Sequence, residues 1–109
     1  IDAVEGDKYD DDKLRYDLLP PQVLEDDALL YTYGAKKYDD WNWQKGLRFS
    51  RCYAALMRHL QAWWRGEDYD QEMYIHHLTA VRFYAAAVQE YQRLGMDWLD
   101  NRRKEDLGV

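Results

Sequence analysis

A chain of 109 residues has the size of one domain, and its 16% of aromatic residues supplies large side chains for one modest core. No apolar run approaches the roughly 18 residues that span a bilayer, and the single cysteine, Cys52, excludes an internal disulfide. The acidic start lacks the basic and apolar pattern of an export signal, so we expect a cytoplasmic protein without a membrane partner.

The net charge of −6 is concentrated near the N-terminus. Residues 1–12 contain six acidic side chains and one lysine, so they account for five of the six net negative charges. This acidity argues against binding to the phosphate backbone of nucleic acids. Because these residues are polar and show no apolar period, we expect 1–12 to form a mobile acidic arm.

The ends of the first two helices are predicted from residues that break or cap a helix. A helix over about residues 21–33 begins at a proline pair and is expected to end at Gly34. The stretch 38–49 has two tryptophans without a helical period, which predicts a loop. Ser50 is predicted to cap the second helix, and Gly66 is predicted to close it.

The last helix has the clearest apolar period, from a predicted start near Asp70 to Gly95. We expect residues 13–96 to form one catalytic all-α domain of three main helices, followed by a charged C-terminal tail over 97–109. No run of residues predicts a sheet.

Four carboxylates are crowded between the second and third helices, at Glu67, Asp68, Asp70 and Glu72. Hard oxygen ligands of this kind suit Mg²⁺ or Mn²⁺, so the cluster predicts a divalent metal site. The alternative is an acidic loop that caps the last helix, because its dipole favours negative charge at the N-terminus. Capping accounts for one or two of the acids better than for four.

Two histidines add to this cluster. His77 is expected two turns beyond Asp70 on the same helical face, where both could reach one site. The alternative, a histidine satisfied in the core, is about equally compatible with the sequence. His59 lies one turn before Trp63 on the preceding helix, so it could face the same junction and support a ligand.

A basic and aromatic segment precedes the second helix. Lys36, Lys37 and Lys45 bracket Trp41 and Trp43, which together offer charge for phosphates and aromatic faces for a base. Single-stranded nucleic acid binding uses the same combination, although the net acidity opposes it. The alternative for both tryptophans is burial in the core.

A series of short motifs spans residues 13–92. In chain order they are Lys13, Arg15, Asp17-Leu18-Leu19-Pro20-Pro21, Tyr33-Gly34-Ala35-Lys36-Lys37-Tyr38, Asn42-Trp43-Gln44-Lys45-Gly46, Arg58-His59-Leu60, Gly66-Glu67-Asp68, Asp70-Gln71-Glu72 and His77-Leu78. In this combination the chain resembles the phage-associated dATP/dGTP diphosphohydrolase family, in particular its MazZ-type members. That family is distantly similar to the MazG-like all-α nucleoside triphosphate pyrophosphohydrolases.

The resemblance implies a MazG-like fold and hydrolysis of a purine deoxynucleoside triphosphate, dGTP or dATP, to the monophosphate and pyrophosphate. It implies Mg²⁺ or Mn²⁺ as cofactor, the host cytoplasm as location, and a link to phage DNA that carries 2-aminoadenine. The residues assigned are Glu67, His77 and His59 as catalytic; Glu67, Asp70 and Glu72 as metal ligands; and Lys36, Lys37, Lys45, Asn42, Trp43 and Arg58 as substrate-binding.

The metal motif is incomplete relative to MazG. Glu67 and Asp70 reproduce an ExxD half, but no ExxE half lies upstream, and His59 and Glu72 are the available substitutes. A competing hypothesis is a non-catalytic helical module that binds a partner protein through its last helix. Both hypotheses predict a homo-oligomeric helical bundle, because three helices with this many aromatic residues seldom close into a monomer.

Overall fold

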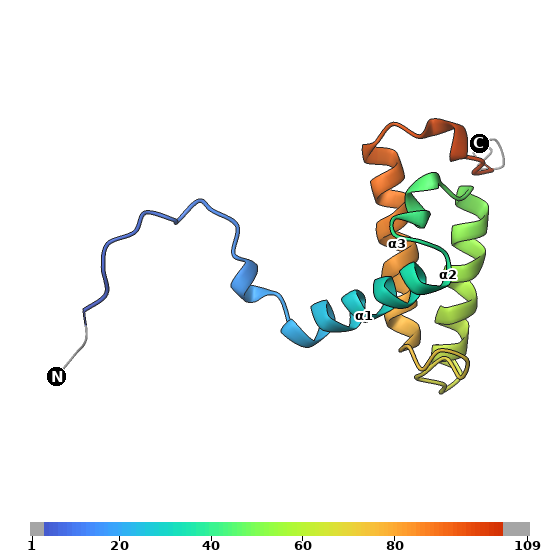
Figure 1. Cartoon of the computed structure of the whole chain (residues 1–109), viewed down its shortest axis with the longest axis horizontal. Helices are drawn as coiled ribbons and strands as arrows, with labels where there is room; N and C mark the ends of the chain where they lie inside the picture. Colours follow the sequence, from blue (N-terminus) through green and yellow to red (C-terminus); the bar gives the residue numbers. More distant parts are fainter. Residues whose placement is uncertain (1–3, 104–109) are drawn as a thin grey trace.

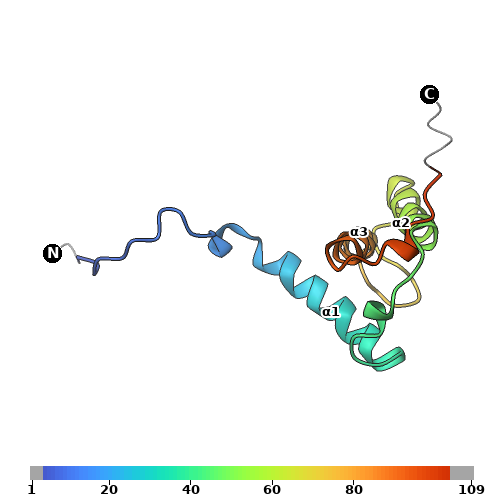
Figure 2. The same cartoon turned by 90° about the horizontal axis from the view of Figure 1, so that it is seen from above.

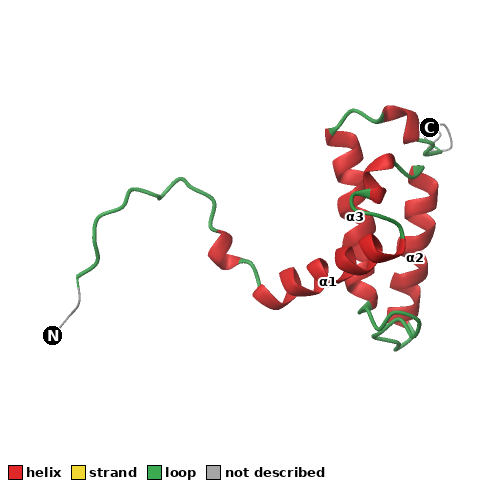
Figure 3. Ribbon diagram, in the orientation of Figure 1, coloured by secondary structure: helices red, strands yellow, loops and turns green. Residues whose placement is uncertain are grey.

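The computed structural model describes residues 4–103, and within them the fold is all helical (Figure 3). The elements in chain order are η1 (Tyr16–Leu18), α1 (Pro21–Lys37), η2 (Asn42–Lys45), α2 (Phe49–Trp64), α3 (His77–Arg93) and η3 (Asp97–Leu99), where η denotes a 3-10 helix. The prediction of an all-α fold with three main helices is therefore confirmed.

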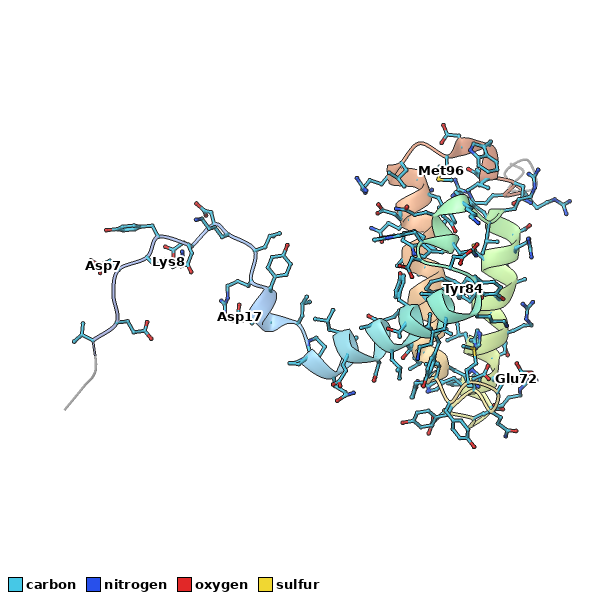
Figure 4. All side chains as sticks on the ribbon, viewed as in Figure 1. Asp7, Lys8, Asp17, Glu72, Tyr84 and Met96 are labelled. Atoms are coloured by element: carbon cyan, nitrogen blue, oxygen red, sulfur yellow. The ribbon has the colours of Figure 1, made fainter. Side chains whose placement is uncertain are left out.

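Helices α2 and α3 form an antiparallel hairpin that carries the core (Figure 1). The cluster of buried apolar side chains lies toward one end of this hairpin, where the two short helices η2 and η3 also pack. Its members are Phe49, Cys52, Ala87, Tyr91 and Leu99. The loop that joins α2 to α3 lies at the opposite end of the hairpin, so it is free to serve a purpose other than core packing (Figure 4).

Helix α1 packs against α3 from about Asp27 onward. Arg82 pairs with Asp27 at 2.9 Å, and the ring of Tyr31 meets Phe83 edge to face. No side chain of α1 is buried, and its first turns project away from the hairpin (Figure 2). The extended segment before η1 is exposed throughout its described residues, and residues 1–3 of the expected arm lie outside the description.

Gly34 does not end α1, contrary to the sequence prediction. It keeps a helical backbone without a positive φ, and its carbonyl accepts the N–H of Tyr38 in the last turn. Lys36 and Lys37 extend the helix to that point, where the helix dipole favours cations. A glycine inside a helix lowers its propensity by about 1 kcal/mol, so Gly34 weakens the last turns of α1 without ending them.

Ser50 is not the cap of α2, because the helix begins one residue earlier, at Phe49. The amide of Asn101 takes that role from the other end of the chain. Its Oδ1 accepts the Ser50 N–H at 2.9 Å, and its Nδ2 donates to Ser50 Oγ at 2.8 Å. This long-range partner satisfies one of the N–H groups that the first turn of a helix leaves without a partner inside the helix.

Both predicted glycine stops are confirmed. Gly66 has φ +104° and Gly95 has φ +72°, a region that favours glycine. After α2 the N–H of Gly66 bonds to Trp63 and that of Glu67 to Ala62, which is a Schellman closure.

The segment after α3 is divided between core and surface. Leu99 is 1% exposed and belongs to the core cluster, whereas Trp98 is exposed. The rest of the predicted charged tail is described only to Arg103. Within residues 4–103 no helix combines the length and the hydrophobicity needed to cross a membrane.

Candidate metal centre

The loop between α2 and α3 folds back on itself. Tyr69 forms an antiparallel bridge with His76, and the Asp70 N–H donates to the Ile75 carbonyl at 2.8 Å. Ile75 is 5% exposed and anchors the loop, while Tyr74 turns the chain with φ +56°. The loop therefore returns Asp70 to the start of α3.

The last helix begins at His77, not near Asp70 as predicted. The Asp70 carboxylate accepts the N–H groups of Glu72 and Met73, at 2.8 and 3.4 Å, and thereby closes a local turn. The cap of α3 is His76, whose Nδ1 accepts the Leu78 N–H. The prediction that Asp70 and His77 lie close together because they share one helical face is therefore wrong.

The loop nevertheless brings Asp70 to the two histidines. One ligand atom from each of His59, Asp70 and His77 lies within 4.8 Å of the others. His59 comes from α2, Asp70 from the loop and His77 from the first position of α3. The side chain of His77 is almost fully buried, and the other two are half-buried.

Glu67 fixes the orientation of His77. Its Oε1 lies 3.1 Å from His77 Nε2, and because a carboxylate only accepts, the Nε2–H donates. A neutral ring then carries its lone pair on Nδ1, which is the atom 2.8 Å from Nδ1 of His59. The carboxylate behind the ring thus directs a nitrogen lone pair toward the cluster.

Burial also affects His59. Removal from solvent lowers the pKa of its imidazole, and the neighbouring His77 acts in the same direction, while the carboxylate of Asp70 opposes both. The ring of Tyr84 stacks on His59 with centroids 6.3 Å apart, which accounts for part of this burial. His59 is therefore favoured in the neutral form that ligates metals.

The cluster fits a divalent ion. Two nitrogen atoms in neighbouring positions on one ion, each about 2.1 Å from it, lie about 3 Å apart, close to the separation of the two Nδ1 atoms. Histidines that bind metals commonly donate their other N–H to a carboxylate, as His77 does to Glu67. Two imidazoles and one carboxylate suit Mn²⁺ and related ions better than Mg²⁺, which prefers oxygen ligands.

The predicted carboxylate ligands separate into different positions. Asp70 belongs to the cluster, and Glu67 touches it through His77. Glu72 is exposed and joins no group of potential metal ligands among residues 4–103. Asp68 contributes its backbone carbonyl to the His77 N–H at 2.8 Å, so it positions the histidine without its carboxylate.

The predicted phosphate-binding lysines are exposed at two places. Lys36 and Lys37 lie in the last turn of α1, and the Lys37 Nζ lies 5.2 Å from the centre of the Tyr38 ring. Lys45 ends η2, which begins with the half-buried Asn42. None of these four side chains contacts the three-residue cluster in the described structure.

The two tryptophans of this segment differ. Trp43 packs against the core cluster, and its carbonyl accepts the Tyr91 hydroxyl at 2.5 Å. Trp41 is 65% exposed and has a left-handed backbone, with φ +62°. The alternative of core burial therefore holds for Trp43 and not for Trp41.

Arg58 lines a cavity beside the histidines. This cavity of about 250 Å³ lies between α2, the short segment before it and α3; its lining residues are Leu47, Arg51, Ala54, Ala55, Arg58 and Tyr84. Arg51 and Tyr84 were not among the predicted site residues. The spacing of Arg51 and Arg58, two helical turns apart, is the sequence signal that places both on one face of α2.

Comparison with known proteins gives a family and one relative. A dATP/dGTP diphosphohydrolase of Salmonella phage PMBT28 is 35% identical over 72 residues, which are 66% of this chain. The chain spans about a quarter of that relative, since the match covers 24% of its length. No solved structure matches. The family described as dATP/dGTP diphosphohydrolase, N-terminal, matches residues 3–102, and the chain therefore belongs to that family.

Proposed function

We propose that this chain hydrolyses purine deoxynucleoside triphosphates, dGTP or dATP, to the monophosphate and pyrophosphate with a divalent metal. The observation that carries the proposal is the convergence of His59, Asp70 and His77 in a protein of this family. The name of the phage relative supports the same substrate class. In a phage this activity would act on the nucleotide pool, and the link to 2-aminoadenine DNA is part of the proposal.

The chain's own residues would divide the work as follows. His59, Asp70 and His77 hold the ion, for which the two imidazoles favour Mn²⁺ over Mg²⁺. A bound ion would supply Lewis-acid activation of water and neutralise charge on the phosphates. Glu67 keeps the His77 lone pair directed at the cluster, and its second oxygen is available to accept a proton.

The positive charge that would balance the phosphates of the substrate comes from basic side chains of α1, η2 and α2. Arg58 lies one residue before His59, so its guanidinium is the predicted phosphate contact nearest the cluster. Lys36, Lys37 and Lys45 are proposed to offset phosphate charge at longer range. Asn42 and Trp43 remain proposed contacts of the nucleoside, and the packing of Trp43 on the core leaves only part of its ring for that role.

The product pattern tests the function. Purified protein is incubated with each of the four dNTPs and Mn²⁺ or Mg²⁺, and the products are separated by ion-exchange chromatography. The proposal expects dGMP or dAMP together with pyrophosphate in equal amounts, and no stepwise release of orthophosphate. Failure of a folded protein to release pyrophosphate from any dNTP would overturn it. The competing helical interaction module predicts that failure.

We also propose that the chain forms a homo-oligomer through α1. Its 17 residues include no buried side chain, and Leu24 is 63% exposed. Leu18 and Leu19, just before the helix, are also exposed. Exposed leucines on a helix of this length are typical of a face that a second copy covers.

A further inference from the structure

The cavity beside the histidine cluster combines an apolar floor with two guanidinium groups. Arg51, Ala54, Ala55 and Arg58 recur at spacings of three and four residues, so they share one face of α2. The two alanines are short, which leaves the space between the arginines open. Neither arginine forms an ion pair with any side chain within residues 4–103, although the chain as a whole is acidic.

Tyr84 joins this cavity to the candidate metal centre. Its side chain lines the cavity and its ring stacks on His59, with an angle of 23° between the two planes. Figure 4 shows Tyr84 between the end of the hairpin that carries Met96 and the loop that carries Glu72. A ligand in the cavity therefore lies next to the cluster, separated from it by one aromatic pair.

The volume of the cavity and the charge of its lining indicate which part of a nucleotide it binds. Pockets for ligands of drug size usually have about 300–1,000 Å³, so about 250 Å³ is too small for a whole nucleotide. Two unpaired guanidinium groups match the oxygen atoms of phosphates, to which arginine donates in pairs. A neutral purine base would leave both charges without a partner.

We propose that this cavity binds the triphosphate chain of the substrate, with Arg51 and Arg58 as its two clamps and Tyr84 as the wall shared with the metal centre. This inference rests on the proposed function for the identity of the substrate. The cavity itself, however, recognises a polyphosphate whether or not hydrolysis follows.

Binding can be measured apart from catalysis. Inorganic tripolyphosphate is titrated calorimetrically into the full chain in EDTA at low salt, where no turnover interferes. Arg51→Gln and Arg58→Gln should each weaken binding about tenfold or more, because each removes charge-assisted hydrogen bonds. Arg65→Gln is the matched control: it removes an exposed arginine at the C-cap of the same helix, outside the cavity, and should change affinity less than twofold.

A second variant tests the space without changing charge. Ala54→Leu, at an exposed helix position, should fill the cavity and weaken tripolyphosphate binding while the melting temperature stays within a few degrees. A single-stranded oligonucleotide without a 5′-triphosphate should not compete, which distinguishes a nucleotide's phosphates from those of nucleic acid. Equal binding by the Arg51→Gln and Arg65→Gln proteins, or no binding by the wild type, overturns the inference.

The experiments distinguish a failure of the proposed hydrolysis from a failure of the cavity assignment. If the wild type releases pyrophosphate from dGTP and Arg51→Gln leaves KM unchanged, the cavity is wrongly assigned although the function stands. If tripolyphosphate binds through both arginines but no dNTP is hydrolysed, the cavity assignment stands and the proposed function fails. A rise in KM with little change in kcat supports both.

Discussion

At the scale of single residues, the position of one proton on a neutral His77 ring would decide what the cluster can bind. In that ring the Nε2–H donates to Glu67, which leaves the lone pair of Nδ1 facing His59. Without the carboxylate the ring could adopt the other tautomer and turn its N–H toward the cluster. We therefore propose that Glu67 acts on a bound metal through His77, whereas its sequence position predicted a direct ligand.

Replacing Glu67 by Ala should therefore weaken Mn²⁺ binding about 10- to 100-fold, the usual effect of losing the carboxylate that orients a metal-binding histidine. Glu72→Ala, which removes an exposed carboxylate of the same loop, should leave the affinity unchanged. Calorimetric titration of both proteins measures the difference. A loss in Glu72→Ala as large as that in Glu67→Ala would restore the ligand set that the acidic spacing predicted.

Tyr91 is the residue whose ionisation bears most on stability. Burial raises its pKa to about 12 from 10.0, and its hydroxyl donates to the Trp43 carbonyl. Since the unfolded phenol ionises at lower pH than the folded one, stability contributed by Tyr91 is complete below pH 10 and falls as the pH rises toward 12. Tyr91→Phe should lose about 0.5–1.5 kcal/mol at pH 7, the net contribution of one hydrogen bond, because the Trp43 carbonyl keeps the Gly46 N–H as a second partner. It should also lose stability less steeply above pH 10. Urea unfolding at pH 7 and pH 11 tests both effects, and an equally steep alkaline loss in the variant would contradict them.

At the scale of elements, the apolar period and the stops at Gly66 and Gly95 were sufficient to predict three helices, and each misplaced boundary has its own physical cause. The helix start predicted near Asp70 failed because that carboxylate closes its own turn. The Ser50 cap failed because Asn101 reaches the helix from a distant part of the chain. The acids and His77 were found from composition and spacing, whereas the pairing of His59 with His77 depends on how α2 and α3 pack. No local pattern contains that information.

The turn before α2 offers a test of element packing. Gly46 has φ +101°, and a Cβ there would lie 2.8 Å from Leu99 Cδ1 and 3.0 Å from Met96 Cε. Gly46→Ala should therefore cost about 1–3 kcal/mol, from backbone strain and displacement of η3. Gly34→Ala is the matched control, since nothing lies within 4 Å of its Cβ and a helical glycine gains about 0.5–1 kcal/mol on replacement. Chemical denaturation of both proteins gives the comparison. A stable Gly46→Ala protein would contradict the packing of η3 described above.

At the scale of the whole molecule, the chain exposes more surface than a compact monomer of its mass. The accessible surface is 9366 Å², whereas a folded monomer of 13.2 kDa exposes about 6,400 Å². The extended N-terminal segment and the projecting first turns of α1 contribute to the excess (Figures 1 and 2). Both carry exposed leucines, so the large open surface includes apolar side chains.

The proposed association through α1 can be tested in solution. Light scattering after size exclusion should give a multiple of the 13.2 kDa chain mass, and Leu24→Glu should shift the protein toward the monomer because it places a charge in the apolar face of α1. Ala86→Glu adds the same charge to an exposed position of α3 and should leave the mass unchanged. A wild-type protein that is monomeric at micromolar concentration would exclude the α1 interface.

The proposed hydrolysis depends on His59, Asp70 and His77 acting as one metal centre. The most direct test is the initial rate of pyrophosphate release from dGTP, measured against Mn²⁺ concentration for the wild type and for Asp70→Asn. We predict that the wild type releases pyrophosphate at a rate that rises with Mn²⁺ concentration and saturates, and that the rate of the variant is at least about 100-fold lower. Equal rates in the two proteins, or a wild-type rate that does not depend on the metal, would contradict it.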